Sequence, residues 1–93
     1  MNMKIEWSER ALLDMRRISA YISLDNRTAA KNLIQGFRKS AKHLASHPYL
    51  GRRTETGDVR ELVLHPNDLL SYRVSAAHVE VLQVWHVAQF RYH

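Results

Sequence analysis

Three short apolar runs in the second half of the chain constrain the fold more than any other feature. Each run is rich in β-branched, aromatic and aliphatic side chains, as strands are. The runs are residues 59–64, 69–74 and 79–87. The gaps between them, 65–68 and 75–78, carry turn residues, and Pro66 has no N–H to give to a strand ladder. The pattern therefore predicts an antiparallel meander of three strands.

The third run carries apolar residues at odd and even positions alike, so both of its faces are largely apolar. A strand of this kind is central in its sheet and covered above and below. We therefore expect residues 79–87 in the middle of the sheet. On such a sheet Arg60, Arg73 and His86 can be brought near one another, although strand register cannot be read from a sequence.

The start of the chain predicts a short strand followed by a helix. Residues 3–7 alternate between apolar and charged side chains. Ser8 is a good helix N-cap, and Glu9 places a negative charge in the first turn, where the helix dipole favours it. Apolar residues then recur at helical spacing, which predicts an amphipathic helix that ends near Ser23.

A second helix follows after a short connection. Asn26 or Thr28 can serve as its N-cap, and apolar residues return at helical spacing over residues 30–46 before Pro48 stops the helix. Because the connection is short, the two helices should form an antiparallel hairpin. Gly36 lies inside the second helix, and we expect it to allow close approach of the two helices.

Residues 47–57 are a loop by composition, since they include a proline and two glycines. The chain therefore predicts an α+β fold with the order β-α-α-β-β-β, in which a two-helix hairpin packs on one face of a small, antiparallel-rich sheet. A chain of 93 residues is long enough for one modest core. We expect residues 1–93 to form a single domain.

Composition limits the compartment and the chemistry. The chain has no cysteine, which excludes a disulfide framework and thiolate catalysis. No apolar run approaches the roughly 20 residues that span a bilayer. Glu6 and Glu9 also fall where a signal peptide would carry no acid. We therefore expect a soluble, cytoplasmic protein.

Positive charge is concentrated in the middle of the chain. The net charge is +5, and no acidic residue occurs between Asp25 and Glu55. Such a surface attracts nucleic acid or an acidic protein, although a solvated helix face has the same composition. The candidate residues for binding a partner or nucleic acid are Lys31, Arg38, Lys39, Lys42, Arg52 and Arg53.

One pair of histidines has the spacing of metal ligands. His43 and His47 stand four residues apart on the expected second helix and its exit. No third ligand follows nearby, so we expect no metal site, and nothing else in the chain implies a cofactor.

Several short motifs occur in a fixed order along almost the whole chain. They are Trp7-Ser8, Tyr21-Ile22, His47-Pro48, Gly51-Arg52, Val59-Arg60-Glu61-Leu62, His65-Pro66-Asn67, Tyr72-Arg73-Val74 and Val84-Trp85-His86. Their order and spacing resemble the RelE/ParE family of bacterial type II toxins. The resemblance implies a toxin of a plasmid-stabilising toxin–antitoxin system that inhibits growth. It also implies a hetero-oligomer in which the acidic or extended C-terminal segment of a cognate antitoxin wraps around the toxin.

Two mechanisms are implied by this resemblance. RelE-like members are mRNA interferases, metal-independent endoribonucleases that act on the ribosome, whereas ParE-like members inhibit DNA gyrase and lack that catalytic set. The nuclease reaction needs cations on the phosphate and a proton acceptor near the 2′-oxygen. If this chain were a nuclease, its catalytic residues would be Arg60, Arg73, His86, Arg91, Tyr92 and His93.

The chain departs from the RelE-like pattern at two positions. Leu69 stands where RelE-like members carry an arginine three residues before the tyrosine, and Ala88 or Gln89 stands where they carry a second one. The Val-Arg-Glu-Leu and His-Pro-Asn segments are closer to ParE-like members, although residues 87–89 depart from the usual ParE-like ending. We therefore expect a ParE-like toxin that poisons DNA gyrase. The alternative is a ribosome-dependent endoribonuclease.

Overall fold

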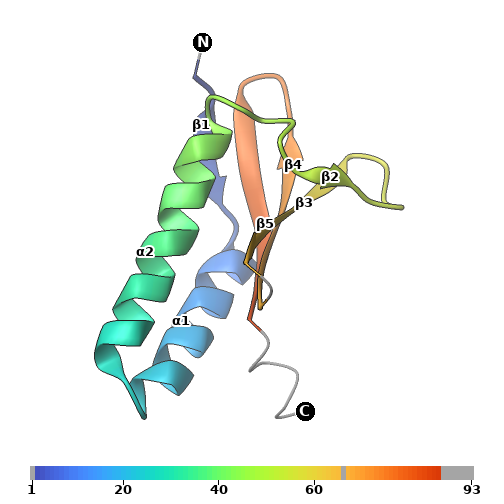
Figure 1. The fold of residues 1–93 in the computed structure, drawn as a ribbon. Coiled ribbons are helices and arrows are strands. Elements are labelled where there is room, and N and C mark those ends of the chain that lie inside the picture. The colour runs from blue at the N-terminus through green and yellow to red at the C-terminus, as the bar shows by residue number, and fades with distance from the viewer. Residues whose placement is uncertain (1, 66, 87–93) are drawn as a thin grey trace.

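The structure is a computed structural model of the chain, and it describes residues 2–65 and 67–86. Two helices pack against a five-stranded sheet (Figure 1), which confirms the predicted α+β class. In chain order the elements are β1 (Lys4–Trp7), α1 (Glu9–Ser23), α2 (Arg27–Leu44), β2 (Arg52–Arg53), β3 (Val59–His65), β4 (Asp68–Val74) and β5 (His78–His86).

The three predicted strands lie side by side as an antiparallel meander, β3 to β4 to β5. The sheet order is β1-β5-β4-β3-β2, so the first strand of the chain pairs with the last, and this one pair is parallel. β5 is therefore an inner strand, as predicted. β2 was not predicted, because two arginines in a loop-like segment carry no strand pattern. It pairs with Arg60 and Glu61 of β3.

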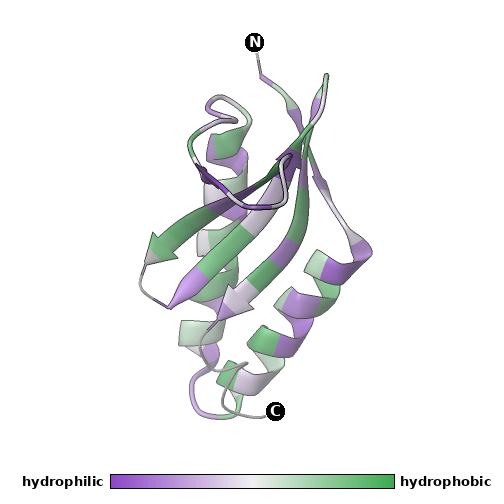
Figure 2. Cartoon of the chain, turned by 90° about the vertical axis from the view of Figure 1, so that its right-hand side faces the viewer, coloured by the Kyte–Doolittle hydropathy of each residue, from purple (hydrophilic) through white to green (hydrophobic). Residues whose placement is uncertain are grey.

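The core lies between the helical hairpin and one face of the sheet. α1 and α2 run antiparallel on the same side of the strands (Figure 1). Figure 2 shows the sheet from the other side, where hydrophilic and hydrophobic residues alternate along the strands. The largest fully buried side chains are Tyr72, Phe37, Leu44, Leu70, Val79, Val81 and Val84.

A β-bulge explains why the third run is apolar on both faces. Ser71 of β4 pairs with Gln83, but the next residue, Tyr72, pairs with Val81, so Leu82 has no partner on β4. One extra residue shifts the alternation by one position, and Val84 thereby joins Val81 on the buried face. The expected cover above and below this strand is not provided by the helices, since both lie on one face.

The two helix starts follow the sequence closely. The Ser8 hydroxyl accepts a hydrogen bond from the N–H of Ala11 at 3.0 Å, and the Asn26 side chain accepts one from Ala29 at 2.9 Å. The expectation for Gly36 is wrong. A β-carbon built there meets no atom within 4 Å beyond its own helix backbone, so Gly36 does not allow a close helix approach.

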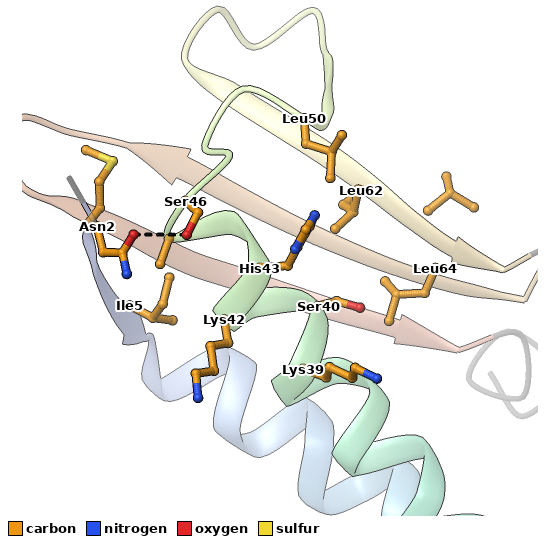
Figure 3. Close-up of a pocket in the computed structure, with 13 residues that line it drawn as sticks. Asn2, Ile5, Lys39, Ser40, Lys42, His43, Ser46, Leu50, Leu62 and Leu64 are labelled. Carbon is orange, nitrogen blue, oxygen red and sulfur yellow. Dashed lines mark hydrogen bonds between the residues drawn. The ribbon is translucent and has the colours of Figure 1, made fainter.

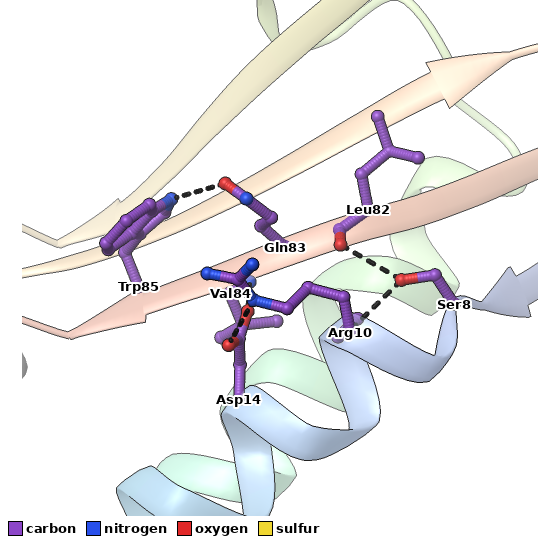
Figure 4. A network of polar contacts seen from close by, with 8 residues as sticks. Ser8, Arg10, Asp14, Leu82, Gln83, Val84 and Trp85 are labelled. Atoms are coloured by element: carbon purple, nitrogen blue, oxygen red, sulfur yellow. Dashed lines mark hydrogen bonds and ion pairs between the residues drawn. The ribbon is translucent and has the colours of Figure 1, made fainter.

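Side chains of α1 complete the edge of β5 where β1 ends. β1 pairs with β5 only as far as Val81. Beyond that point the Ser8 hydroxyl donates to the Leu82 carbonyl at 2.9 Å, and the buried Asp14 carboxylate accepts the N–H of Val84 at 3.1 Å (Figure 4). Arg10 contacts the other oxygen of Asp14 at 3.0 Å. These contacts hold the hairpin at a fixed place on the sheet.

The hairpin carries no membrane-spanning segment. Over residues 2–65 and 67–86, neither helix combines the length and the apolar character that crossing a bilayer requires.

Candidate functional site

Two grooves run along α2, one on each side of it. The first, which we call the inner groove, curves around the C-terminal turns of α2 and has a volume of about 770 Å³. Leu50, Leu62 and Leu64 face the helix across it, and His43 and Lys39 stand on the helix side (Figure 3). The inner groove is lined by Asn2, Met3, Ile5, Lys39, Ser40, Lys42, His43, Ala45, Ser46, Leu50, Leu62, Val63 and Leu64.

The inner groove thus combines an apolar wall with cations. Leu50 is 54% exposed although it is a large aliphatic residue, and Val63 at the same groove is 52% exposed. Residues 62–65 of β3 also lie beyond the end of β2, which pairs only with residues 60 and 61. An exposed apolar wall beside an unpaired strand edge is a typical place for a partner chain to bind.

Tyr72 and Arg60 hold the loop that carries Leu50. The buried Tyr72 hydroxyl donates to the carbonyl of Pro48 and accepts the N–H of Gly51, both at 2.8 Å. The Arg60 guanidinium donates to the carbonyl of Gly51 at 2.9 Å and lies 4.9 Å from the Tyr49 ring centre. A β-carbon at residue 51 would come within 2.7 Å of the tyrosine ring, so only glycine fits there.

Burial raises the pKa of the Tyr72 hydroxyl above its ordinary value of 10.0. The hydrogen bond from Gly51 and the charge of Arg60 act in the opposite direction but do not cancel the effect of burial. The phenol is therefore neutral near pH 7, which it must be to donate to the Pro48 carbonyl.

The second groove, which we call the outer groove, is the crease between α1 and α2. It opens away from the sheet, because the sheet-facing side of the hairpin is filled by the core. Two adjoining hollows of about 450 and 410 Å³ share Ser19, Ile34 and Arg38. Together they are lined by Leu12, Met15, Arg16, Ser19, Ala20, Ser23, Arg27, Ala30, Lys31, Ile34, Gln35 and Arg38.

The six predicted binding cations are divided among three places. Lys31 and Arg38 line the outer groove, and the Arg38 guanidinium lies 6.0 Å from the Trp7 ring centre. Lys39 and Lys42 line the inner groove. The remaining two, Arg52 and Arg53, form β2 at the far edge of the sheet, where Arg52 pairs with Glu61 at 3.0 Å. The structure thus does not bring the six cations together on one surface.

The structure does not bring Arg60, Arg73 and His86 near one another. Arg60 pairs with Tyr72, the residue before Arg73 on the next strand, so the two arginines point to opposite faces of the sheet. His86 pairs with Asp68, five residues along β4 from Arg73. At about 3.3 Å per residue, this separation is roughly 17 Å along the strand.

Each of these three side chains has a partner within the fold. Arg73 lies on the face of the sheet that the helices do not cover. Its Nε is 2.8 Å from an Asp58 oxygen, but the buried N–H does not point at that oxygen, so the contact is mainly electrostatic. The His86 ring nitrogen lies 2.5 Å from an oxygen of the buried Asp68. Any part that these residues take in catalysis stays a prediction. Arg91, Tyr92 and His93 lie outside the described residues.

The rings of His43 and His47 lie with their centres 4.7 Å apart and their planes tilted by 39°. Among the described residues, no group of three or more histidine, cysteine, aspartate or glutamate side chains could hold a metal ion. His43 instead faces the leucines of the inner groove (Figure 3).

Sequence reasoning missed two groups of residues that the fold brings to the grooves. Arg16 and Arg27 join Lys31 and Arg38 in the outer groove: Arg27 lies on the same face of α2, and the packing of α1 against α2 adds Arg16. Their signal was the helical spacing between Arg27, Lys31 and Arg38, at intervals of four and seven. The apolar wall of Leu50, Leu62 and Leu64 depends on how the loop and β3 face α2, which no periodicity shows.

Comparison with known proteins agrees with this geometry. Residues 5–89 match the family described as the ParE toxin of the type II toxin–antitoxin system parDE. Toxin RelE2 of Caulobacter vibrioides is 31% identical over 86 residues, which is 92% of this chain and 97% of that protein.

Solved structures show the same fold. The chromosomal ParDE toxin–antitoxin system of P. aeruginosa aligns with a TM-score of 0.78 and 25% identity, covering 91% of this chain and 96% of that one. The RelBE2 toxin–antitoxin complex of Mycobacterium tuberculosis aligns with a TM-score of 0.65 and 16% identity, covering 92% of this chain and 99% of that one.

The fold defines a small α+β toxin of the kind found in bacterial type II toxin–antitoxin systems. Since the match spans nearly the whole sequence, the chain belongs to the ParE toxin family within the wider RelE/ParE group. The resemblance drawn from its motifs is thereby confirmed.

Proposed function

We propose that this toxin inhibits growth by poisoning DNA gyrase in the cytoplasm. The observation that carries the proposal is the ParE match over residues 5–89, since the ParE-like branch of the group acts on gyrase. The ribonuclease alternative has less support from the geometry. Arg60 is bound to loop carbonyls, Arg73 and His86 are each beside an acid, and the three do not share a site.

We further propose that a cognate antitoxin neutralises the toxin by laying an extended segment in the inner groove. The P. aeruginosa and M. tuberculosis neighbours are both from toxin–antitoxin systems. The leucine wall offers apolar contact, the free edge of β3 offers backbone hydrogen bonds, and Lys39 and Lys42 attract acidic side chains. A segment that alternates apolar and acidic residues would use all three.

The test of the gyrase proposal compares the two possible targets in parallel. Purified toxin is added to gyrase with relaxed plasmid, and separately to ribosomes translating a defined mRNA. We expect loss of supercoiling with accumulation of cleaved plasmid, and intact transcripts. The antitoxin should restore supercoiling when added in equal amount.

Two variants separate the proposal from its alternative. Tyr92→Phe and His93→Ala each remove a group that the nuclease reaction would use, whereas poisoning of gyrase needs no proton transfer by these side chains, so both should still inhibit gyrase. Cleaved transcripts with normal supercoiling, together with loss of activity in these variants, would instead assign the chain to the ribosome-dependent endoribonucleases.

A further inference from the structure

We infer that the outer groove binds the phosphate backbone of duplex DNA, at a place separate from the groove proposed for the antitoxin. The choice of DNA rests on the proposed action on gyrase, an enzyme that works on a DNA duplex. The groove itself is defined by the packing of α1 on α2 and by the four cations Arg16, Arg27, Lys31 and Arg38.

The charge of the outer groove suits a polyanion. All four cations are exposed, and no acidic side chain lines the groove within the described part of the chain. Arg16, Arg27 and Lys31 form no hydrogen bond or ion pair with any described residue, so no described side chain neutralises their charges. Charges of one sign in a concave surface attract an anion more strongly than scattered ones.

The dimensions suit a nucleic-acid strand. Arg27 and Arg38 are separated by eleven residues of α2, which is about 16 Å along a helix at 1.5 Å per residue. One strand of B-DNA places a phosphate about every 3.4 Å along the axis, so the groove spans roughly five phosphates. Ser19, Ser23 and Gln35 stand between the cations, and side chains of these types donate to phosphate oxygens in protein–DNA complexes.

The composition of the outer groove favours the backbone of a duplex over two other anions. A single strand is held by stacking its bases on aromatic side chains, but none of the described residues that line this groove is aromatic. An extended acidic peptide also gains backbone hydrogen bonds from a free strand edge, and that edge lies at the inner groove and not at the outer one. Duplex phosphates need neither.

The test measures binding of the full chain to a 30-base-pair DNA duplex by fluorescence anisotropy over a range of salt concentrations. The variant Arg27→Gln with Lys31→Gln should bind roughly tenfold more weakly at low salt, because two phosphate contacts are lost. The slope of log affinity against log salt should fall by roughly 1.8 if each cation neutralises one phosphate. Glutamine is a good helix former, so α2 should persist.

The matched control is Lys39→Gln with Lys42→Gln, which removes the same charge from the same helix at the inner groove. This control should bind the duplex as the wild type does. Equal weakening of both double variants would overturn the inference, because net charge alone would then explain binding. Retained binding by the Arg27 and Lys31 variant would overturn it also.

Two further arms test the choice of DNA. A duplex RNA of equal length and a polyglutamate chain replace the DNA, with the same variants. Tighter binding to either, with the same dependence on Arg27 and Lys31, would reassign the groove to that partner and overturn the DNA proposal. Gyrase inhibition is measured separately, so failure of the gyrase proposal is distinguishable from failure to bind the duplex.

Discussion

The two grooves of this toxin share one helix and differ in what surrounds it. Both receive cations from α2: Lys39 and Lys42 at the inner groove, Lys31 and Arg38 at the outer one. The inner groove adds the aliphatic wall of Leu50, Leu62 and Leu64 and the free edge of β3, whereas the outer groove adds serines, Arg27 of α2 and Arg16 of α1. Charge alone therefore does not identify a partner. Both grooves have apolar lining residues, so the free strand edge beside the inner groove and the four cations of the outer one separate a site suited to a protein segment from one suited to phosphate.

The largest change should follow from Phe37→Ala, which breaks both grooves together. Phe37 is fully buried beneath α2, so its removal leaves a cavity in the core that positions the helix. We expect a loss of about 3–5 kcal/mol in the free energy of unfolding, measured by urea denaturation. Leu24→Ala is the control, because Leu24 is 81% exposed. A similar, small loss in both variants would show that α2 does not depend on this contact.

Tyr72→Phe should weaken the inner groove and spare the outer one. The substitution leaves the Gly51 N–H and the Pro48 carbonyl without their partner, and these groups hold the loop that carries Leu50. We expect a loss of about 1–3 kcal/mol in stability. Antitoxin affinity, measured by calorimetry at a temperature where the variant is folded, should fall while duplex binding is unchanged. Equal loss at both grooves would contradict their independence.

The same tyrosine makes a pH prediction whose sign follows from its pKa. In the folded chain the Tyr72 hydroxyl keeps its proton at pH values above its ordinary pKa of 10.0. Between pH 10.0 and the raised pKa, the folded state therefore binds more protons than the unfolded state. The contribution of this proton to the stability of the fold is complete below about pH 10 and is lost as the pH rises through the raised pKa. Stability should therefore fall more steeply above pH 10 in the wild type than in Tyr72→Phe. Parallel curves would contradict this.

A smaller effect is expected from Leu50→Ala, which removes part of the apolar wall without touching the core. Because Leu50 is 54% exposed, stability should change little. If an antitoxin segment buries this side chain, its loss costs about 1–2 kcal/mol, which is roughly a tenfold weaker complex. Leu24→Ala again serves as the matched exposed leucine, and it should bind the antitoxin normally. Unchanged affinity of Leu50→Ala for the antitoxin would contradict the proposal that the antitoxin binds in the inner groove.

The smallest effect, and the only stabilising one, should come from Gly36→Ala. The new β-carbon meets nothing within 4 Å, and alanine is favoured over glycine inside a helix by about 0.5–1 kcal/mol. The melting temperature should rise by a few degrees, with both binding activities unchanged. Gly51→Ala is the opposite control, since its β-carbon would collide with Tyr72. If Gly36→Ala were less stable than the wild type, the new β-carbon would have to collide with a group that the structure does not place there.

These grooves also show how far the sequence carries the argument. Apolar periodicity predicts the hairpin and the meander. The caps predict the helix starts at Ser8 and Asn26, because these starts depend on local hydrogen bonds. The bulge at Leu82 and the strand of Arg52 and Arg53 depend on register, which one sequence does not encode in any readable pattern.

The candidate sites are predicted less well than the fold. Four cations of α2 were correctly singled out as exposed, but their division between two grooves follows from how α2 packs against α1 and faces β3. Helical spacing alone places Lys31, Arg38 and Lys42 on one side of the helix. The packing of α1 then brings Arg16 beside the first two and Arg27 of the same helix, while Lys42 borders the other groove.

The pairing of the first strand with the last has a consequence for the order of events during synthesis. Lys4 pairs with His78, so the sheet stays unfinished until residue 78 has left the ribosome. At roughly 5–20 residues per second, this interval lasts several seconds or more. For most of its translation the nascent chain therefore cannot close its sheet, and the edge of β1 that β5 later covers stays open.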